Sequence, residues 1–135
     1  MTFESHWCVP GRVVFIRYHD EITLGDYRGV AKTMLNAFEE STTQPVHNIV
    51  DYTYMKAMPD TISGGAKALS HITDPRYGWS VVVHAGNPLV KMRTAIMLQV
   101  KGDHFTSVET VQDAVEFLNE ADDTLAGLEW VLPTD

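Results

Sequence analysis

Two kinds of hydrophobic pattern alternate along the chain and predict strands and helices in turn. Near-continuous runs of β-branched and aromatic residues at Arg12–Tyr18 and Gly78–Ala85 are typical of strands buried on both faces. Shorter runs predict further strands at His6–Val9, Val46–Asp51 and His104–Thr106. A Pro-Gly pair between the first two strands predicts a turn, so we expect these strands to form a hairpin.

Apolar residues at intervals of three and four predict a first and a last helix. Thr23 and Asp26 have the spacing of a capping box, so the first helix is expected to begin at Thr23 and to end near Ser41. Thr106 and Glu109 have the same spacing and predict the start of the last helix. The buried stripe of that last helix is expected to consist of Val108, Val111, Val115 and Leu118.

Two further helices are predicted in the middle of the chain. One is expected to follow Pro59-Asp60 and to end at Asp74-Pro75, because the residue before a proline disfavours helical geometry. In the other, Asn87 has the residue type of an N-cap and Pro88 that of the first helical position, and Gly102 closes the helix.

The order β-β-α-β-α-β-α-β-α predicts an α/β sandwich with a mixed, mostly parallel five-stranded sheet and four main helices. We expect one domain over residues 1–135, with a core at about 6–120 and a tail at 121–135. Ligand crevices in such sheets lie at the carboxyl ends of the strands. Those ends are predicted at Tyr18–Asp20, Asp51–Tyr54, His84–Asn87 and Thr106-Ser107.

The tail from Leu125 to Asp135 is rich in large apolar residues, which makes a free tail a poor interpretation. Packing on its own domain is favoured, and a swapped arm in a homodimer is the alternative. The residues concerned are Leu128, Trp130, Val131 and Leu132.

Composition excludes several classes of partner. The chain has 135 residues, of which 44% are hydrophobic, and a formal net charge of −8. That charge disfavours nucleic acid and anionic membrane surfaces, because phosphate binding needs clustered Lys and Arg. Cys8 stands alone, so an intrachain disulfide is excluded and a cytoplasmic location is expected. No signal peptide and no membrane-spanning run is predicted.

The sequence offers little recognisable chemistry. The six histidines include no pair at helical metal-site spacing, and no nucleotide-binding or hydrolase motif occurs, so neither a metal nor a cofactor is predicted. Asp51 and His84 both lie at predicted strand ends and are conceivable as an acid–base pair. A structural role for both residues is favoured, and the chain is not predicted to be an enzyme.

The segment IVDYTYMKAMPDTISGG, Ile49–Gly65, resembles the STAS domain of SpoIIAA-like anti-sigma factor antagonists and sulphate-transporter tails. The resemblance extends over about Arg12–Leu118, mainly in element order and hydrophobic pattern. The opening Trp7–Thr23 resembles that of divergent, uncharacterised bacterial SpoIIAA-like proteins. The architecture is also similar to CRAL-TRIO lipid-transfer domains, which implies an apolar ligand as a further possibility.

The resemblance implies a phosphorylation switch at the start of a helix. In the family, a D-S-S-G-like motif opens the helix after the aspartate-ended strand, and a partner kinase phosphorylates its serine. This chain has one residue more between acid and glycine, so Thr61 is the nearest match and Ser63 the second. The alternative is that Asp60 or Thr61 is only the N-cap of that helix.

The family likeness implies a non-enzymatic bacterial regulatory module that binds a protein partner through residues 51–65 and the following helix, and a kinase-like protein is one class of partner that it implies. The predicted switch and partner-binding residues are Asp51, Thr53, Asp60, Thr61 and Ser63. The alternative function is a small-molecule or lipid-binding domain with an apolar pocket. That pocket would be lined by Tyr52, Tyr54, Met55, Met58, Trp79 and His84.

Overall fold

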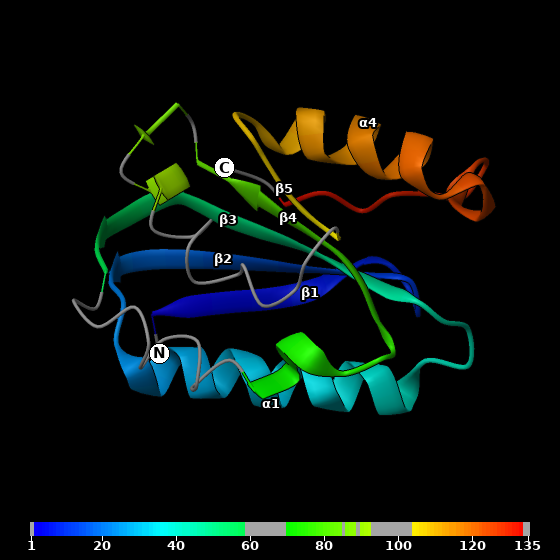
Figure 1. Ribbon diagram of the computed structural model, residues 1–135, viewed down its shortest axis with the longest axis horizontal. Helices are drawn as coiled ribbons and strands as arrows, with labels where there is room; N and C mark the ends of the chain where they lie inside the picture. Colours follow the sequence, from blue (N-terminus) through cyan, green and yellow to red (C-terminus); the bar gives the residue numbers. More distant parts are fainter. Residues whose placement is uncertain (1, 59–69, 85, 89, 93–103, 134–135) are drawn as a thin grey trace.

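The computed structural model describes residues 2–58, 70–84, 86–88, 90–92 and 104–133. They form one five-stranded sheet in the order β1-β2-β3-β4-β5 (Figure 1). The strands are β1 (Phe3–Val9), β2 (Val13–Glu21), β3 (Val46–Ala57), β4 (Tyr77–Val83) and β5 (Phe105–Val108). The helices are α1 (Leu24–Glu40) and α4 (Val111–Ala121), with short 3₁₀ turns η1 (Ser70–Thr73) and η3 (Asp123–Leu125).

The sheet is mixed, as the order of elements predicted. β1 pairs antiparallel with β2, and the other three pairs of neighbouring strands are parallel. The predicted hairpin between β1 and β2 is confirmed. It turns at Gly11, whose φ of 75° lies in the left-handed region that glycine tolerates best.

Two hydrophobic cores lie on opposite faces of this sheet (Figure 1). α1 and η1 cover one face, where Tyr27, Met34 and Phe38 of the helix pack against β-strand residues. α4 covers the other face, where Leu118 and its neighbours pack against residues such as Phe15. Successive strand residues point to opposite faces, so the continuous apolar runs of β2 and β4 supply both cores.

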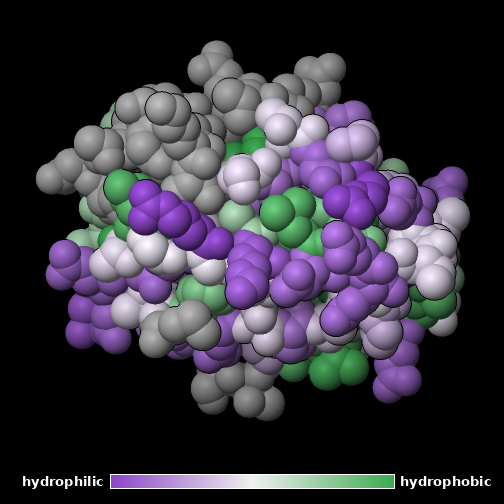
Figure 2. Space-filling model, turned by 90° about the horizontal axis from the view of Figure 1, so that it is seen from below, coloured by the Kyte–Doolittle hydropathy of each residue, from purple (hydrophilic) through white to green (hydrophobic). Residues whose placement is uncertain are grey.

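The outer side of α1 is polar. Figure 2 views this side from below, and its described residues are mainly hydrophilic, with hydrophobic residues in small separate groups. Among the exposed residues of α1 are Arg28, Lys32, Glu39 and Glu40. This face therefore offers no broad apolar area for a partner within the described part of the chain.

The predicted start of α1 is confirmed. Thr23 is the N-cap, its hydroxyl accepts from the backbone N–H of Asp26 at 3.1 Å, and the Asp26 carboxylate accepts from the backbone N–H of Thr23 at 2.8 Å. Asn87 also behaves as predicted, because its side-chain oxygen accepts from the N–H of Val90, and Pro88 is helical.

The predicted start of the last helix is wrong. Thr106 lies inside β5, and the N-cap of α4 is Thr110, whose hydroxyl accepts from the N–H of Asp113 at 3.1 Å. The reason is strand pairing, since β5 continues beside β4 as far as Val108. Val108 therefore belongs to the sheet and not to the helix stripe, which contains Ala114, Val115 and Leu118 as its buried residues.

β3 runs further than predicted. It does not end at Asp51 but continues to Ala57, paired with β2 after its pairing with β4 has ended.

The described residues contain three of the four predicted helices. These are α1, α4 and the first turn of a helix that begins at Pro88. The helix predicted after Pro59-Asp60 lies outside the described residues, apart from its last part, which forms η1. No described helix is long and apolar enough to cross a membrane.

The tail packs against its own chain. Leu125 is fully buried, and Trp130 contacts the core under α4. The backbone N–H of Val131 donates to the carbonyl of Cys8 at 2.8 Å, which fixes the tail beside β1. Leu128 remains exposed, as do Val131 and Leu132, so only part of the apolar tail is covered.

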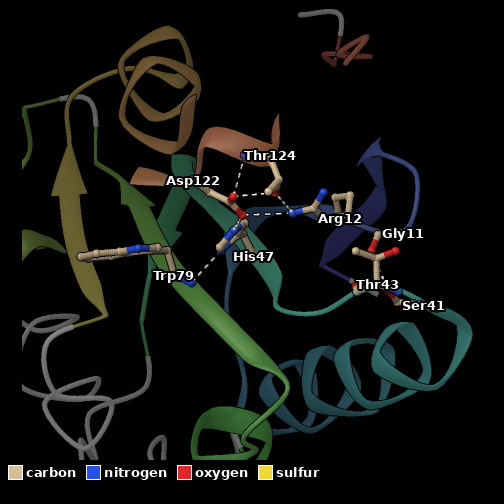
Figure 3. Close-up of polar contacts among 8 residues, drawn as sticks. All are labelled: Gly11, Arg12, Ser41, Thr43, His47, Trp79, Asp122 and Thr124. Atoms are coloured by element: carbon tan, nitrogen blue, oxygen red, sulfur yellow. Dashed lines mark hydrogen bonds and ion pairs between the residues drawn. The ribbon is translucent and has the colours of Figure 1, made fainter. Parts of the chain in front are cut away.

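The end of α4 is fixed by the carboxylate of Asp122, as Figure 3 shows. Its Oδ2 accepts from Arg12 Nη2 at 3.0 Å and from His47 Nε2 at 2.8 Å. Its Oδ1 accepts from the backbone N–H of Thr124 at 3.0 Å and from the Thr124 hydroxyl at 2.5 Å. The carboxylate thus joins the start of β2, the start of β3 and the first residues after α4.

The hydrogen bonds of His47 define its tautomer. Nδ1 accepts from the backbone N–H of Trp79 at 2.8 Å, so Nε2 carries the hydrogen that is donated to Asp122. The ring is 2% exposed and packs so closely on Gly78 that a Cβ there would lie 2.4 Å from Nδ1. His47 is therefore a structural histidine.

Replacing Asp122 by alanine is expected to lower the free energy of unfolding by about 3 kcal/mol, because it leaves the buried Arg12 charge without its carboxylate. Urea unfolding followed by circular dichroism measures the loss. Asp123→Ala is the matched control, since Asp123 is the neighbouring, exposed aspartate. Equal losses in the two variants would contradict the assigned role.

Stability is also expected to depend on the protonation of Asp122. Burial by itself raises the pKa of Asp122, but hydrogen bonds from His47 and Thr124 outweigh it and lower the pKa from 3.8 to about 2. The folded state binds this proton less tightly than the unfolded chain does. The contribution, about 2 kcal/mol, is therefore complete above about pH 4 and is lost as the pH falls toward about 2. Unfolding curves across this range should fall more steeply for the wild type than for Asp122→Asn, and parallel curves would count against the assignment.

Candidate functional site

The middle and carboxyl-terminal parts of β2 and β3 meet the start of α4 around a cavity of about 230 Å³. We call this region the Tyr54 surface. It consists of Arg17, Asp51, Thr53, Tyr54, Glu109, Thr110 and Val111. The parallel pairing of β2 with β3 places Arg17 directly beside Asp51, so two charged side chains from buried strands lie next to each other.

A buried ion pair forms the base of the Tyr54 surface. Arg17 Nε donates to Asp51 Oδ2 at 2.9 Å, and the two side chains are 5% and 1% exposed. Asp51 Oδ1 accepts from both the backbone N–H of Thr53 at 2.9 Å and its hydroxyl at 2.5 Å. Three donors therefore hold the carboxylate, which orders the chain at Thr53 and leaves Asp51 poorly placed to act as a general base.

Tyr54 is an exposed aromatic residue on this base. It is 41% exposed, and the Arg17 guanidinium lies 4.8 Å from the centre of its ring. The ring of His19 stacks on it with a centroid distance of 6.0 Å. The same guanidinium lies 5.2 Å from the ring of Phe15 in the core. Tyr54 is thus held by a cation–π contact and a stacking contact while part of its surface faces solvent.

The structure does not pair Asp51 with His84 in any described contact. Asp51 is engaged by Arg17 and Thr53. His84 lies in the turn after β4, where its Nδ1 accepts from the N–H of Gly86 at 3.1 Å and its carbonyl accepts from the N–H of Asn87 at 2.8 Å. His84 therefore orders the turn that leads into the helix at Pro88.

The residues predicted to line one apolar pocket are distributed over different parts of the structure. Tyr52 is buried in the core under α1, where it borders an internal cavity of about 20 Å³, and Met55 and Met58 pack against the same core. Trp79 packs on the opposite core. Tyr52, Tyr54 and Trp79 thus border three separate cavities, while His84 lies in the turn after β4.

Asp60, Thr61 and Ser63 lie outside the described residues, so phosphorylation there stays a prediction. Among the residues that the structure describes, no group of three or more His, Cys, Asp or Glu side chains is arranged to hold a metal ion.

Arg17, His19 and Glu109 belong to or border the site, and sequence reasoning did not select them. A signal for Arg17 was present, because a single arginine inside the apolar run RVVFIRY must find a buried partner if the strand is buried on both faces. Glu109 lies at the site because α4 begins after Thr110. The sequence prediction began this helix at Thr106 instead, and so assigned Glu109 to its capping box.

Two solved structures are similar in fold. One is the anti-sigma factor antagonist SpoIIAA in its unphosphorylated form, with a TM-score of 0.59 and 13% identity, over 87% of this chain and 96% of that chain. The other is an uncharacterised protein of the DUF3478 family with a SpoIIAA-like fold, from Shewanella loihica PV-4. It has a TM-score of 0.59 and 15% identity, over 78% of this chain and 83% of that chain. No protein-family model and no curated protein matches the chain. The predicted SpoIIAA-like fold is confirmed.

Replacing Arg17 by methionine is expected to lower the free energy of unfolding by about 3–5 kcal/mol, because it leaves the buried Asp51 carboxylate without its ion-pair partner. The double variant Arg17→Met, Asp51→Leu is expected to recover much of the loss, since no unpaired charge remains. Chemical denaturation measures both. Lys56→Met is the control, because its ion pair with Asp20 is largely exposed and should contribute nothing measurable. A double variant as unstable as Arg17→Met would contradict this account.

Proposed function

We propose that the chain is a non-enzymatic regulatory module of the anti-sigma factor antagonist type, which binds a protein partner through the Tyr54 surface and the residues that follow it in sequence, as far as Gly65. Two things support the proposal. The fold is that of SpoIIAA, whose description as an anti-sigma factor antagonist names a protein-binding activity. The Tyr54 surface also lies where the sequence resemblance places the partner-binding segment, at Asp51 and the residues after it.

The single observation that carries the proposal is the exposure of Tyr54 on a rigid base. Exposed Tyr and Arg side chains are enriched among the residues that dominate protein interfaces. A ring already held by Arg17 and His19 loses little conformational freedom when a partner covers it. Tyr54 is therefore preorganised for contact with another protein.

Charge favours a partner with a basic surface. The chain has a formal net charge of −8, and the Tyr54 surface includes the exposed Glu109. Opposite charges on a partner would accelerate association and fix its orientation. A phosphate on Thr61 or Ser63, both near this surface in sequence, would add negative charge, which strengthens the attraction to a basic part of the partner and weakens binding to any acidic part. A kinase-like enzyme is the class of partner that such a switch requires.

The functional hypotheses differ in what Asp51 must do. An enzyme would need Asp51 or His84 free to exchange protons, whereas the described hydrogen bonds of both residues serve local structure. An interaction module needs only the shape and rigidity that those bonds produce. The geometry therefore supports the interaction module better than the acid–base pair.

Tyr54→Ala is expected to weaken partner binding by at least about tenfold, as expected for loss of a central aromatic contact. Partners are identified by quantitative affinity capture from the native organism, and the affinity of each purified candidate is then measured by calorimetry. Leu128→Ala is the matched control, because Leu128 is also 41% exposed but lies in the tail. If Tyr54→Ala retains every partner at wild-type affinity, the Tyr54 surface is not the interface.

A further inference from the structure

A second and larger cavity lies at the opposite end of the sheet, at the amino ends of β3 and β4. Its volume is about 700 Å³, against about 230 Å³ at the Tyr54 surface, and small-molecule sites are commonly about 300–1,000 Å³. We call it the amino-end cleft. Its walls include Asp74, Tyr77, Trp79, His104 and Asp122.

The aromatic wall of the amino-end cleft is preformed. The ring of Trp79 meets Phe117 edge to face at 4.8 Å and lies 5.1 Å from the ring of His104. Its backbone N–H is bound to His47, and Figure 3 shows the ring extending from there toward β5. Trp79 is only partly buried, so a flat ligand can contact the indole without rearranging the core.

The charged groups that line the cleft are both carboxylates. Hydrogen bonds from Arg76 lower the pKa of Asp74, and those from His47 and Thr124 lower that of Asp122 against the opposing effect of burial, so both stay ionised at neutral pH. The lining contains no Lys or Arg. Both carboxylates are ion-paired with arginines that are not part of the lining, Asp122 with Arg12 at 3.0 Å and Asp74 with Arg76 at 2.8 Å, so the cleft wall offers carboxylate acceptors and no cationic Lys or Arg side chain of its own.

The two carboxylates differ in their remaining capacity to accept hydrogen bonds. Each oxygen of Asp122 already accepts two hydrogen bonds. Asp74 Oδ1 accepts two from Arg76, but Asp74 Oδ2 accepts one described bond, from Arg76 Nη2 at 2.8 Å. A carboxylate oxygen has two lone pairs, so Asp74 Oδ2 has room for a donor from a ligand.

We propose that the amino-end cleft binds a small organic cation that carries a flat aromatic ring and an amine, with the ring on Trp79 and the ammonium group on Asp74. Such a ligand matches both features of the wall, because an ammonium group is attracted to carboxylates and to indole faces. This site is separate from the Tyr54 surface and does not depend on the proposed partner binding.

Three compounds with the same indole ring and different charge test the proposal: tryptamine, tryptophol and indole-3-propionate. Each is titrated into the ¹⁵N-labelled full chain and followed by NMR. Tryptamine is expected to bind at least about tenfold more tightly than indole-3-propionate, with tryptophol between them. The shifted amides should include those of Asp74, Trp79 and His104. Binding of the propionate as tightly as tryptamine, shifts centred elsewhere, or no response to tryptamine would each overturn the proposal.

Variants separate the two contacts. Asp74→Asn is expected to weaken tryptamine while leaving tryptophol unchanged, and Asp20→Asn, at an exposed aspartate on β2, is expected to change neither. His104→Ala removes an exposed side chain beside Trp79 and is expected to weaken all three ring compounds together, which keeps the test valid if Asp74→Asn disturbs its turn. Tyr54→Ala should leave tryptamine binding intact, so failure here and failure of the partner proposal are distinguishable. Tryptamine affinity unchanged in both Asp74→Asn and His104→Ala would refute the site.

Discussion

The carboxylate of Asp122 is the constraint on which the arrangement of this fold depends. It accepts four hydrogen bonds, from Arg12, His47 and both the backbone and the hydroxyl of Thr124. Taking a charge out of water is unfavourable unless such partners surround it. Because its donors come from the start of β2, the start of β3 and the residues after α4, satisfying all of them restricts how these elements lie relative to one another. Asp122 also caps α4, which covers one of the two cores, and lines the amino-end cleft.

Arginine–aspartate ion pairs lie at both ends of the sheet, but the surfaces that they form differ. At the carboxyl ends, the Arg17–Asp51 pair is covered by Tyr54, which stays exposed and forms a raised aromatic contact. At the amino ends, the pairs of Asp122 and Asp74 lie in the walls of a recess. The exposed Tyr54 surface therefore has the form of a protein-binding surface, and the amino-end cleft has the form of a small-molecule pocket. β3 contributes His47 to one end and Asp51 to the other, so a single strand supports both.

Local features of this fold were predictable, and features set by distant residues were not. The capping box of Thr23 and the N-cap of Asn87 involve residues three positions apart, so their spacing identifies them. Thr106 and Thr110 both precede an acidic residue by three positions, and only the pairing of Val108 with Val83 decides between them. β3 extends past Asp51 for a similar reason, because β2 continues beside it when β4 has ended. Arg17 and Asp122 were missed because their partners are remote in the sequence.

The sequence separation of the Asp122 contacts has a consequence for how the chain folds. Arg12 and His47 lie 110 and 75 residues before the carboxylate that holds them. During synthesis, β1 to β4 are made well before Asp122, and until then Arg12 and His47 lack the carboxylate to which they donate in the folded chain. Contacts of such long range slow folding, because the chain must close a large loop before it gains the interaction. The sheet is therefore expected to reach its final packing only after the segment that carries Asp122 has been made.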